Sequence, residues 1–324
     1  MKAFFTEEQD LLRATLVRVF DDWGRRPEGE RGSDGLFDRL VEIGCAELPG
    51  QPERGVLFEE AGYACAGGAI VPVLGVALPV LEDLDPTGAL CAAVRAGTAL
   101  PVVALDRFVV SADQATHLLV LEGDEVGVVE RSGVRLEPVP SFDPGRPLAA
   151  FEVVAAPTIV GALADVRSVM AREGLLAVAH ELTGIGRACL DVAVEHARTR
   201  LQFGRPIGSN QAISHQCVDM YIAVESARSH VYSAADAAER GDPSVELAVR
   251  QAHAVAADAA IFCAHRSIQV LGGLGFTWEH PAHRYLRRAQ SSAHLVMDAR
   301  SSRERVATLI GLGAGEGMDG MEES

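Results

Sequence analysis

The first hundred residues place their apolar side chains at the spacing of α-helices. Residues 4–23 (FFTEEQDLLRATLVRVFDDW) show this pattern behind Thr6, a favoured N-cap residue, with two glutamates near the positive end of the helix dipole. Two further helical patterns, residues 36–48 and 54–68, each end near glycine. Residues 1–98 are therefore predicted to form a small helical domain.

The pattern changes at about Leu100, where short β-branched runs replace the helical spacing. These runs are separated by Asp, Gly and Pro, and the segment EGDE is typical of a turn. The region is too short for a large sandwich, and we expect a shortened middle β domain over residues 99–161. The runs cover residues 101–110, 115–130, 133–140 and 148–160.

From about Ala162 the helical period returns and continues almost to the end of the chain. Four long helices with short Gly and Pro joints describe a bundle over residues 162–312. The fold class is therefore predicted as mainly α, and the glycine-rich acidic tail, residues 313–324, is predicted to be disordered. The four helices are expected at residues 166–201, 211–241, 244–272 and 281–311.

Composition narrows the classes of partner. The chain has 324 residues and a net charge of −16, which argues against binding a nucleic-acid backbone, because that requires clustered positive charge. A small anionic ligand would have to lie near one of two local basic clusters, residues 198–205 and 283–288. Hydrophobic residues make up 48% and aromatic residues only 5%, which favours helices packed through small aliphatic side chains.

The cysteines and the N-terminus indicate the cellular compartment in which the protein is expected. No two cysteines form a CxxC pair, so neither a zinc site nor a disulfide framework is expected, and the cysteines are typical of buried residues in a reducing cytoplasm. The N-terminus has no signal-peptide pattern, and no run is judged long and apolar enough to span a bilayer; residues 71–84 come closest. The cysteines are Cys45, Cys65, Cys91, Cys189, Cys217 and Cys263.

Two local motifs carry the candidate chemistry. The first, RLQFGRPIGSNQ, covers residues 200–211 between the first two bundle helices, and the second, QVLGGLGF, covers residues 269–276 at the end of the third. Each motif alone has a structural explanation, as a basic helix end or a glycine C-cap. Their joint occurrence, in this order on a four-helix pattern, resembles the C-terminal domain of the acyl-CoA dehydrogenase family, flavoproteins that form a C2=C3 double bond in acyl-CoA thioesters.

The resemblance implies that these motifs contact an FAD bound mostly by the neighbouring subunit. In this interpretation the guanidinium of Arg200 faces a pyrophosphate, and Gln211 lies at a helix start whose free N–H groups also favour an anion. Glycines near the second motif would let the cofactor approach closely. The implied FAD-binding residues are Arg200, Gln202, Phe203, Gln211, Gln269, Gly272 and Gly273.

The resemblance also implies a glutamate base that removes the C2 proton, at one of two places in the family. Counting along the chain puts these places at about Val296 and about Gly174, and neither residue is a carboxylate. Glu173 is adjacent to the second place, but one residue rotates a helical side chain by roughly 100°. Glu181 is a second alternative, although a buried glutamate paired to an arginine is the favoured interpretation of it. No residue is therefore assigned as catalytic base.

Histidines suggest no further site. His294 and Asp298 are one helical turn apart near the expected active-site wall, and a surface i, i+4 contact is favoured over a catalytic pair. His180, His215 and His265 lack the spacing of metal ligands and are expected to be ordinary bundle residues. No metal is predicted.

The middle domain departs from the family pattern. The Thr-Glu-Pro and Gly-Ser-Asp segments that would flank the flavin ring are missing, and residues 101–117 read PVVALDRFVVSADQATH. The resemblance then points to the short subunit of a hetero-oligomer, of α2β2 type, that completes the FAD site of a longer paralogous subunit acting on an acyl-CoA. Similarity to steroid side-chain-degrading members suggests a steroid CoA ester. The alternatives are a non-catalytic scaffold subunit, or a homo-oligomeric dehydrogenase that uses Glu173 or Glu181 as base.

Overall fold

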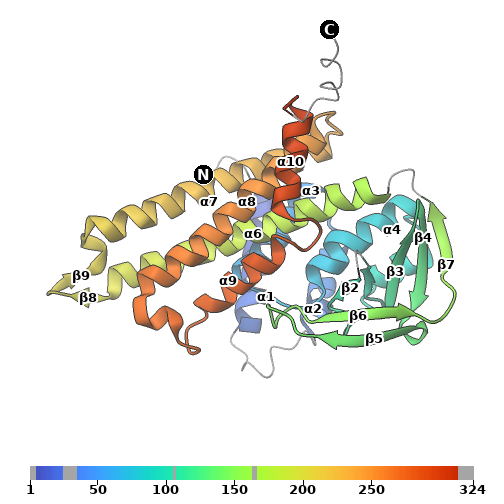
Figure 1. The fold of residues 1–324 in the computed structure, drawn as a ribbon, viewed down its shortest axis with the longest axis horizontal. Coiled ribbons are helices and arrows are strands. Elements are labelled where there is room, and N and C mark those ends of the chain that lie inside the picture. The colour runs from blue at the N-terminus through green and yellow to red at the C-terminus, as the bar shows by residue number, and fades with distance from the viewer. Residues whose placement is uncertain (1–4, 25–34, 105–106, 163–165, 313–324) are drawn as a thin grey trace, which may run out of the picture.

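A computed structural model describes residues 5–24, 35–104, 107–162 and 166–312 (Figure 1). The N-terminal helix begins with a capping box, in which the Gln9 amide donates to Thr6 Oγ (3.2 Å) and the Thr6 amide donates to Gln9 Oε1 (3.1 Å). The predicted Thr6 cap is confirmed. The helices of this region are α1 (Glu7–Gly24), α2 (Leu36–Glu42), α3 (Gln51–Tyr63), the π-helical η3 (Ile70–Ala77), α4 (Leu78–Leu84) and α5 (Ala89–Arg95).

The strands form two small sheets beside α4 (Figure 1). One sheet has the order β1-β3-β4-β7 and the other has the order β2-β6-β5. The EGDE turn joins β3 and β4, which pair antiparallel with Glu122 opposite Glu125. The strands are β1 (Pro101–Val103), β2 (Phe108–Val110), β3 (His117–Glu122), β4 (Glu125–Glu130), β5 (Val134–Val139), β6 (Leu148–Val153) and β7 (Thr158–Ala162).

Long helices make up the rest of the molecule and extend away from the sheets (Figure 1). The predicted mainly α fold with a small β region and a C-terminal bundle is confirmed. The hairpin of β8 and β9 projects from the end of the bundle that is remote from the sheets. The elements are α6 (Val166–Thr199), β8 (Leu201–Gln202), β9 (Arg205–Pro206), α7 (Gln211–Glu239), α8 (Val245–Leu271), the 3-10 turn η6 (Gly272–Phe276), α9 (Ala282–Ser292) and α10 (Ala299–Leu309).

The prediction of one long fourth helix is wrong, because the structure has two shorter helices there, α9 and α10. Asp298 has an extended ψ of 150°, and its Oδ1 accepts from the Ser301 amide (2.9 Å) as the N-cap of α10. His294 Nδ1 donates to the Gln290 carbonyl (3.0 Å) instead. The expected i, i+4 contact between His294 and Asp298 therefore does not arise within one helix.

Alanine dominates the central helix of the bundle. Ala256, Ala260 and Ala264 on α8 are fully buried, which lets neighbouring helices approach closely. The segment Val245–Phe276 is long and apolar enough to cross a bilayer by length and composition, contrary to the expectation from sequence. Since 56% of its apolar window is buried inside the molecule, packing in the bundle accounts for its composition.

A buried ion network ties the N-terminal helices to the bundle. Glu59 and Glu60 on α3 are 0% and 2% exposed, and Arg187 on α6 donates to both carboxylates at 2.6 Å. Arg13 on α1 and Tyr232 on α7 also donate to Glu59, at 3.4 and 2.6 Å, and Arg228 on α7 lies 3.5 Å from it. Burial alone would raise the pKa of Glu59, but the surrounding arginines lower it, so the carboxylate stays ionised.

Candidate functional site at the bundle end

A tight hairpin reverses the chain between α6 and α7. Gln202 of β8 pairs with Arg205 of β9, and Phe203 and Gly204 form the two-residue loop with φ of 52° and 76°. Positive φ at both loop residues matches the right-handed twist of the paired strands. The chain reverses at this loop, and the Phe203 side chain is 98% exposed at its tip.

The second motif ends α8 in a glycine cap. Gly272 has φ of 60° and ψ of −134°, and its amide donates to the carbonyls of Gln269 and Ile268. This conformation is accessible essentially to glycine alone, so capping explains Gly272. An added Cβ at Gly273 would meet no atom within 4 Å, so packing within the chain does not require glycine there.

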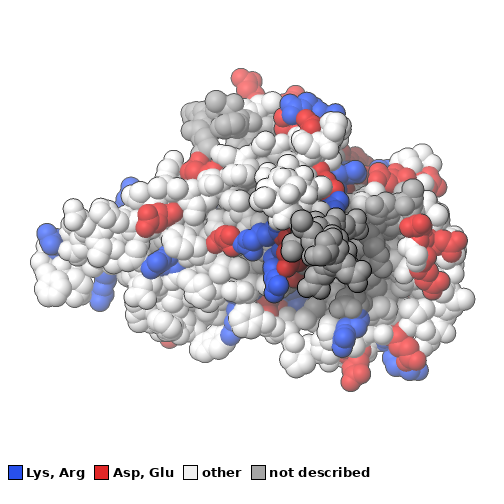
Figure 2. Space-filling view, turned by 45° about the horizontal axis from the view of Figure 1, so that its top comes forward, with Lys and Arg blue, Asp and Glu red and all other residues white. Residues whose placement is uncertain are grey.

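The two motifs lie at the same end of the bundle. Burial and then the nearby His196 of α6 lower the pKa of His280, which follows the second motif. Burial and then Arg200 of the first motif lower the pKa of His196 in turn. Basic side chains in and beside the two motifs therefore lie close together at this end of the bundle. On the face shown in Figure 2, the same tapering end carries several Lys or Arg side chains and few acidic ones.

The residues implied to contact FAD are all exposed, at the end of α6, in the hairpin, at the start of α7 and at the end of α8. The α7 helix begins at Gln211, as predicted. A guanidinium, side-chain amides and an aromatic ring exposed together fit a pyrophosphate-containing cofactor held largely by another subunit, and contact with FAD stays a prediction. The residues are Arg200, Gln202, Phe203, Gln211, Gln269, Gly272 and Gly273.

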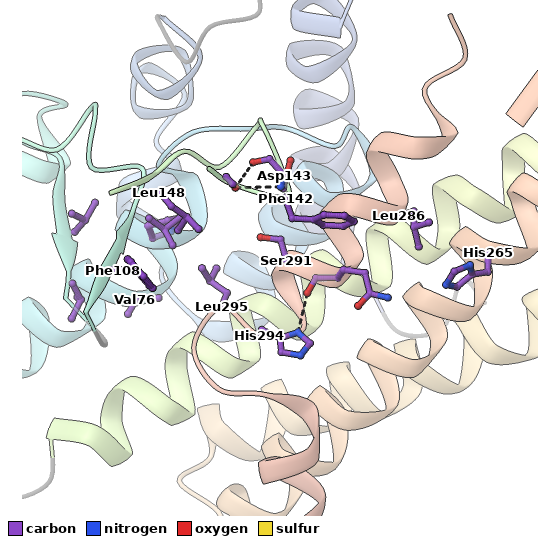
Figure 3. Close-up of a pocket in the computed structure, with 16 residues that line it drawn as sticks. Val76, Phe108, Phe142, Asp143, Leu148, His265, Leu286, Ser291, His294 and Leu295 are labelled. Atoms are coloured by element: carbon purple, nitrogen blue, oxygen red, sulfur yellow. Dashed lines mark hydrogen bonds between the residues drawn. The ribbon is translucent and has the colours of Figure 1, made fainter. Parts of the chain in front are cut away.

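A cavity of about 690 Å³ lies between the bundle and the β sheets (Figure 3). Val76 of η3 and Phe108 of β2 line one side, and Leu286 of α9 and Leu295 line the other. The two places at which the family resemblance put a catalytic base meet beside it: an ideal Cβ on Gly174 would lie 3.0 Å from Val296 Cγ2 and 3.3 Å from a Val76 methyl carbon. Aliphatic contacts thus occupy the place of a carboxylate.

Glu181 is committed to an ion network rather than exposed to this cavity. It is 1% exposed, and Arg146 Nη2 donates to both of its carboxylate oxygens at 2.5 Å. Ser292 Oγ donates to Oε2 (2.9 Å), and Arg288 Nη1 lies 3.4 Å from Oε1. The favoured interpretation, a buried glutamate paired to an arginine, is confirmed.

The network also removes Arg288 from the predicted second basic cluster, residues 283–288. Arg288 is 1% exposed and donates to Asp143 and to the Ala66 carbonyl, so it is not available to an outside anion. Burial alone would lower the pKa of Arg288, but the neighbouring Cys65, Asp143 and Glu181 raise it, so the charge is retained. Sequence reasoning missed the members of this network because they are as far as 222 residues apart.

Glu173 and the remaining histidines have ordinary structural surroundings. Burial raises the pKa of Glu173, Arg172 Nε donates to it (2.8 Å), and Gln51 donates to its other oxygen. His180 is buried against Tyr232, His215 is exposed, and His265 borders the cavity. Across the described ranges, no group of three or more His, Cys, Asp or Glu residues is arranged to hold a metal ion.

Known proteins resemble this chain in fold and in sequence. The pattern of the acyl-CoA dehydrogenase C-terminal domain matches residues 169–295. Acyl-CoA dehydrogenase IpdE2 of Mycolicibacterium smegmatis is 30% identical over 327 residues, 93% of this chain and 98% of the relative, and IpdE2 of Mycobacterium tuberculosis is 29% identical, with 94% and 98% covered. FadE34 of Mycobacterium tuberculosis is 36% identical over 79% of this chain, but over only 38% of its own length.

Solved structures define the class of fold. A Tcur3481-Tcur3483 steroid ACAD variant superposes with a TM-score of 0.84 at 23% identity, covering 94% of this chain and 98% of that one. The ChsE4-ChsE5 complex of Mycobacterium tuberculosis does so with a TM-score of 0.84 at 22% identity, covering 96% and 99%. Fold and motifs define an acyl-CoA dehydrogenase-like protein. With a 30% identical relative matched along nearly its whole length, the chain belongs to the acyl-CoA dehydrogenase family.

Proposed function

We propose that this chain is the short subunit of a hetero-oligomeric acyl-CoA dehydrogenase and that it completes an FAD site whose other contacts come from a longer paralogous subunit. One observation carries the proposal: the motif residues are exposed together at the bundle end, whereas Gly174 and Val296 fill the place of a base. Bound FAD would supply the redox chemistry of α,β-desaturation. The partner would supply the base.

This chain's residues would bind and orient the cofactor. Arg200 offers a permanent charge and fixed donors to a pyrophosphate, and the amides of Gln202 and Gln269 offer further hydrogen bonds. The exposed ring of Phe203 offers an apolar contact that also excludes water. These contacts need no titratable group of this chain to exchange a proton.

The relatives support the finer parts of the proposal. Two structures with this fold are named as pairs, Tcur3481-Tcur3483 and ChsE4-ChsE5, and the first is called a steroid ACAD. FadE34 extends well beyond its match to this chain, which leaves room for a second subunit-sized unit in one polypeptide. We propose an α2β2 assembly in the cytoplasm that acts on an acyl-CoA, with a steroid CoA ester as the substrate class.

The test is expression of this chain alone and together with a longer paralogue from the same genome, followed by measurement of flavin absorbance and complex mass. We expect flavin only in the co-expressed complex, at the mass of a hetero-oligomer. A yellow, active protein from this chain alone would instead support the homo-oligomeric alternative with Glu173 or Glu181 as base.

The matched variants for this test are Arg200→Ala and Arg240→Ala. Both arginines are exposed, but Arg240 directly follows α7, at the end of that helix remote from the first motif, and pairs with nearby Asp236. Loss of a charged hydrogen bond worth about 1.5–3 kcal/mol predicts FAD binding that is roughly tenfold to a hundredfold weaker in Arg200→Ala complexes. Full flavin retention in Arg200→Ala, together with full activity after substitution of Gln202, Gln211 and Gln269, would identify a scaffold subunit.

A further inference from the structure

The outer strand of the four-stranded sheet has one edge without a partner. β7 pairs antiparallel with β4 on one side, and no strand within the described ranges pairs with its other side (Figure 1). Its five residues, TIVGA, are all at least partly exposed and carry no charge. Edge strands are usually protected by charged side chains or proline, because their free backbone N–H and C=O groups pair readily with another strand. This edge is therefore open to the addition of a strand.

An apolar groove of about 700 Å³ runs beside this strand. The helices α4 and α5 contribute Leu84 and Leu90, β4 contributes Val128, and β7 contributes Thr158 and Val160. Val160 is a bulge residue that pairs with no residue of β4, and its side chain is 41% exposed. Because side chains alternate between the two faces of a sheet, every second residue of a strand added to β7 would point into this groove. The groove therefore favours an extended segment with apolar residues at alternate positions.

The charges at the groove are acidic. Among the described lining residues, Asp85 and Glu130 are the carboxylates and none is Lys or Arg. Asp85 Oδ1 accepts from the Thr87 amide (3.1 Å) and hydroxyl (2.9 Å), and the exposed Glu130 forms no ion pair within the described ranges. Arg131 donates to the Val134 carbonyl (2.8 Å) instead of to Glu130. A partner with Lys or Arg beside its apolar positions would complement these carboxylates.

The surrounding charges disfavour a second copy of this chain as the occupant. The turn between β3 and β4 carries Glu122, Asp124 and Glu125, all exposed, and β4 is the strand next to β7. In Figure 2 the end of the molecule that holds the sheets shows several acidic side chains along its outer edge. Pairing of β7 with β7 of a second copy would bring these carboxylates together, and like charges on paired strands are destabilising.

We infer that β7 and this groove bind an extended segment of another protein, with apolar residues at alternate positions and Lys or Arg beside them. The backbone of the segment pairs with the free edge of β7, and its apolar side chains enter the groove. The surface is separate from the proposed cofactor residues, because the β8–β9 hairpin lies at the end of the bundle remote from the sheets (Figure 1). The cavity between the bundle and the sheets shares no described lining residue with the groove.

The test uses the full 324-residue chain and the fluorescence anisotropy of a labelled synthetic peptide, KKVTVSVKK. We expect saturable binding of one peptide per chain, and weaker binding at higher salt because exposed charges are screened.

Two kinds of control peptide separate the contributions of charge and backbone. The acidic peptide EEVTVSVEE loses the charge complementarity and should bind about tenfold or more weakly. Two N-methylated forms of KKVTVSVKK, one for each alternate set of backbone amides, keep the side chains, and the form that blocks the amides facing β7 should bind about tenfold or more weakly. Equal binding of the acidic peptide, or of both N-methylated forms, would overturn strand addition. A stable dimer of this chain that excludes the peptide would instead identify a second copy as the occupant.

Variants locate the binding to this edge. Glu130→Lys reverses a charge at the groove, and Glu195→Lys makes the same change at an exposed position of α6 near the β8–β9 hairpin. Val160→Lys puts a positive charge in the groove, and Ile159→Lys puts it on the neighbouring residue, which is 47% exposed and does not line the groove.

We expect peptide binding to weaken roughly fivefold or more in Glu130→Lys and Val160→Lys, and by less than about twofold in Glu195→Lys and Ile159→Lys. Circular dichroism checks that each variant is folded. Equal loss in each variant and its control, or unchanged binding in folded Glu130→Lys, would refute the site.

Discussion

Two groups of arginines in this chain differ in where their charges find partners. Arg200 at the hairpin end is exposed, beside a phenylalanine that is 98% exposed. Arg146 and Arg288, near the cavity, are 2% and 1% exposed and are neutralised by acidic partners within the chain. The buried arginines therefore join helices and strands of the same subunit, whereas the arginine at the hairpin end is open to an external ligand.

This difference separates residues that stabilise the fold from residues that are available for binding. Exposed charges contribute little to folding free energy, whereas a buried charge that loses its partner is strongly destabilising. The hairpin end is thus the place where substitutions test function without unfolding the chain. Substitutions in the buried network test the fold itself.

The largest expected effect comes from removing the central carboxylate of the buried network. Glu181→Gln leaves Arg146 and Arg288 with one counter-charge, Asp143, in place of two. An uncompensated buried charge predicts a loss of about 3–5 kcal/mol in the free energy of unfolding. Urea unfolding at neutral pH measures it.

The control is Glu195→Gln on the same helix, at an exposed position, with an expected change within about 0.5 kcal/mol. Similar unfolding free energies for Glu181→Gln and Glu195→Gln would contradict the division between a structural and an available cluster.

The second prediction concerns how the free energy of unfolding depends on pH, because acid changes it through buried histidines and not through exposed ones. Burial lowers the pKa of His180 and of His253 from 6.5 to about 4, and neither ring nitrogen of His180 has a partner among the described residues. As the pH falls, the histidines of the unfolded chain therefore bind protons at a higher pH than those of the folded chain. Stability is complete above about pH 6.5 and falls as the pH drops toward 4, by about 3 kcal/mol for each histidine at 1.36 kcal/mol per pKa unit.

The variant His180→Leu isolates one of these groups. Its free energy of unfolding should fall less between pH 7.5 and pH 5 than that of the wild type, and His230→Leu, at an exposed histidine of α7, should leave the pH dependence unchanged. Identical pH dependence in His180→Leu and the wild type would show that His180 is not kept neutral by the fold.

Features that depend on local sequence were predictable. The Thr6 cap, the reversal at Phe203–Gly204 and the start of α7 at Gln211 each follow from a few adjacent residues. The break between α9 and α10 was missed because the helical spacing continues through it. Its signal is local, with Asp298 as the N-cap that accepts from the Ser301 amide.

Features that depend on distant residues were not predictable from pattern. Arg146 lies in a β-region loop, and nothing near it in sequence indicates that it bonds Glu181 in the bundle. The cavity likewise takes its walls from η3, the sheets and α9. Counting along the chain put the expected base positions at about Gly174 and about Val296, and the structure adds that these two residues lie side by side.

The smallest expected effect separates stability from binding at the hairpin tip. Phe203 has φ of 52°, which costs a bulky residue about 1 kcal/mol, whereas asparagine followed by glycine suits this turn. Phe203→Asn should therefore raise the free energy of unfolding of this chain by up to about 1 kcal/mol. If the exposed ring contributes to the cofactor site, the same variant should weaken flavin retention in the co-expressed complex. A strained aromatic residue at an exposed tip costs folding free energy, and a binding role would offset that cost. Higher stability with unchanged flavin content would therefore remove Phe203 from the proposed site, and Arg200 would be tested separately.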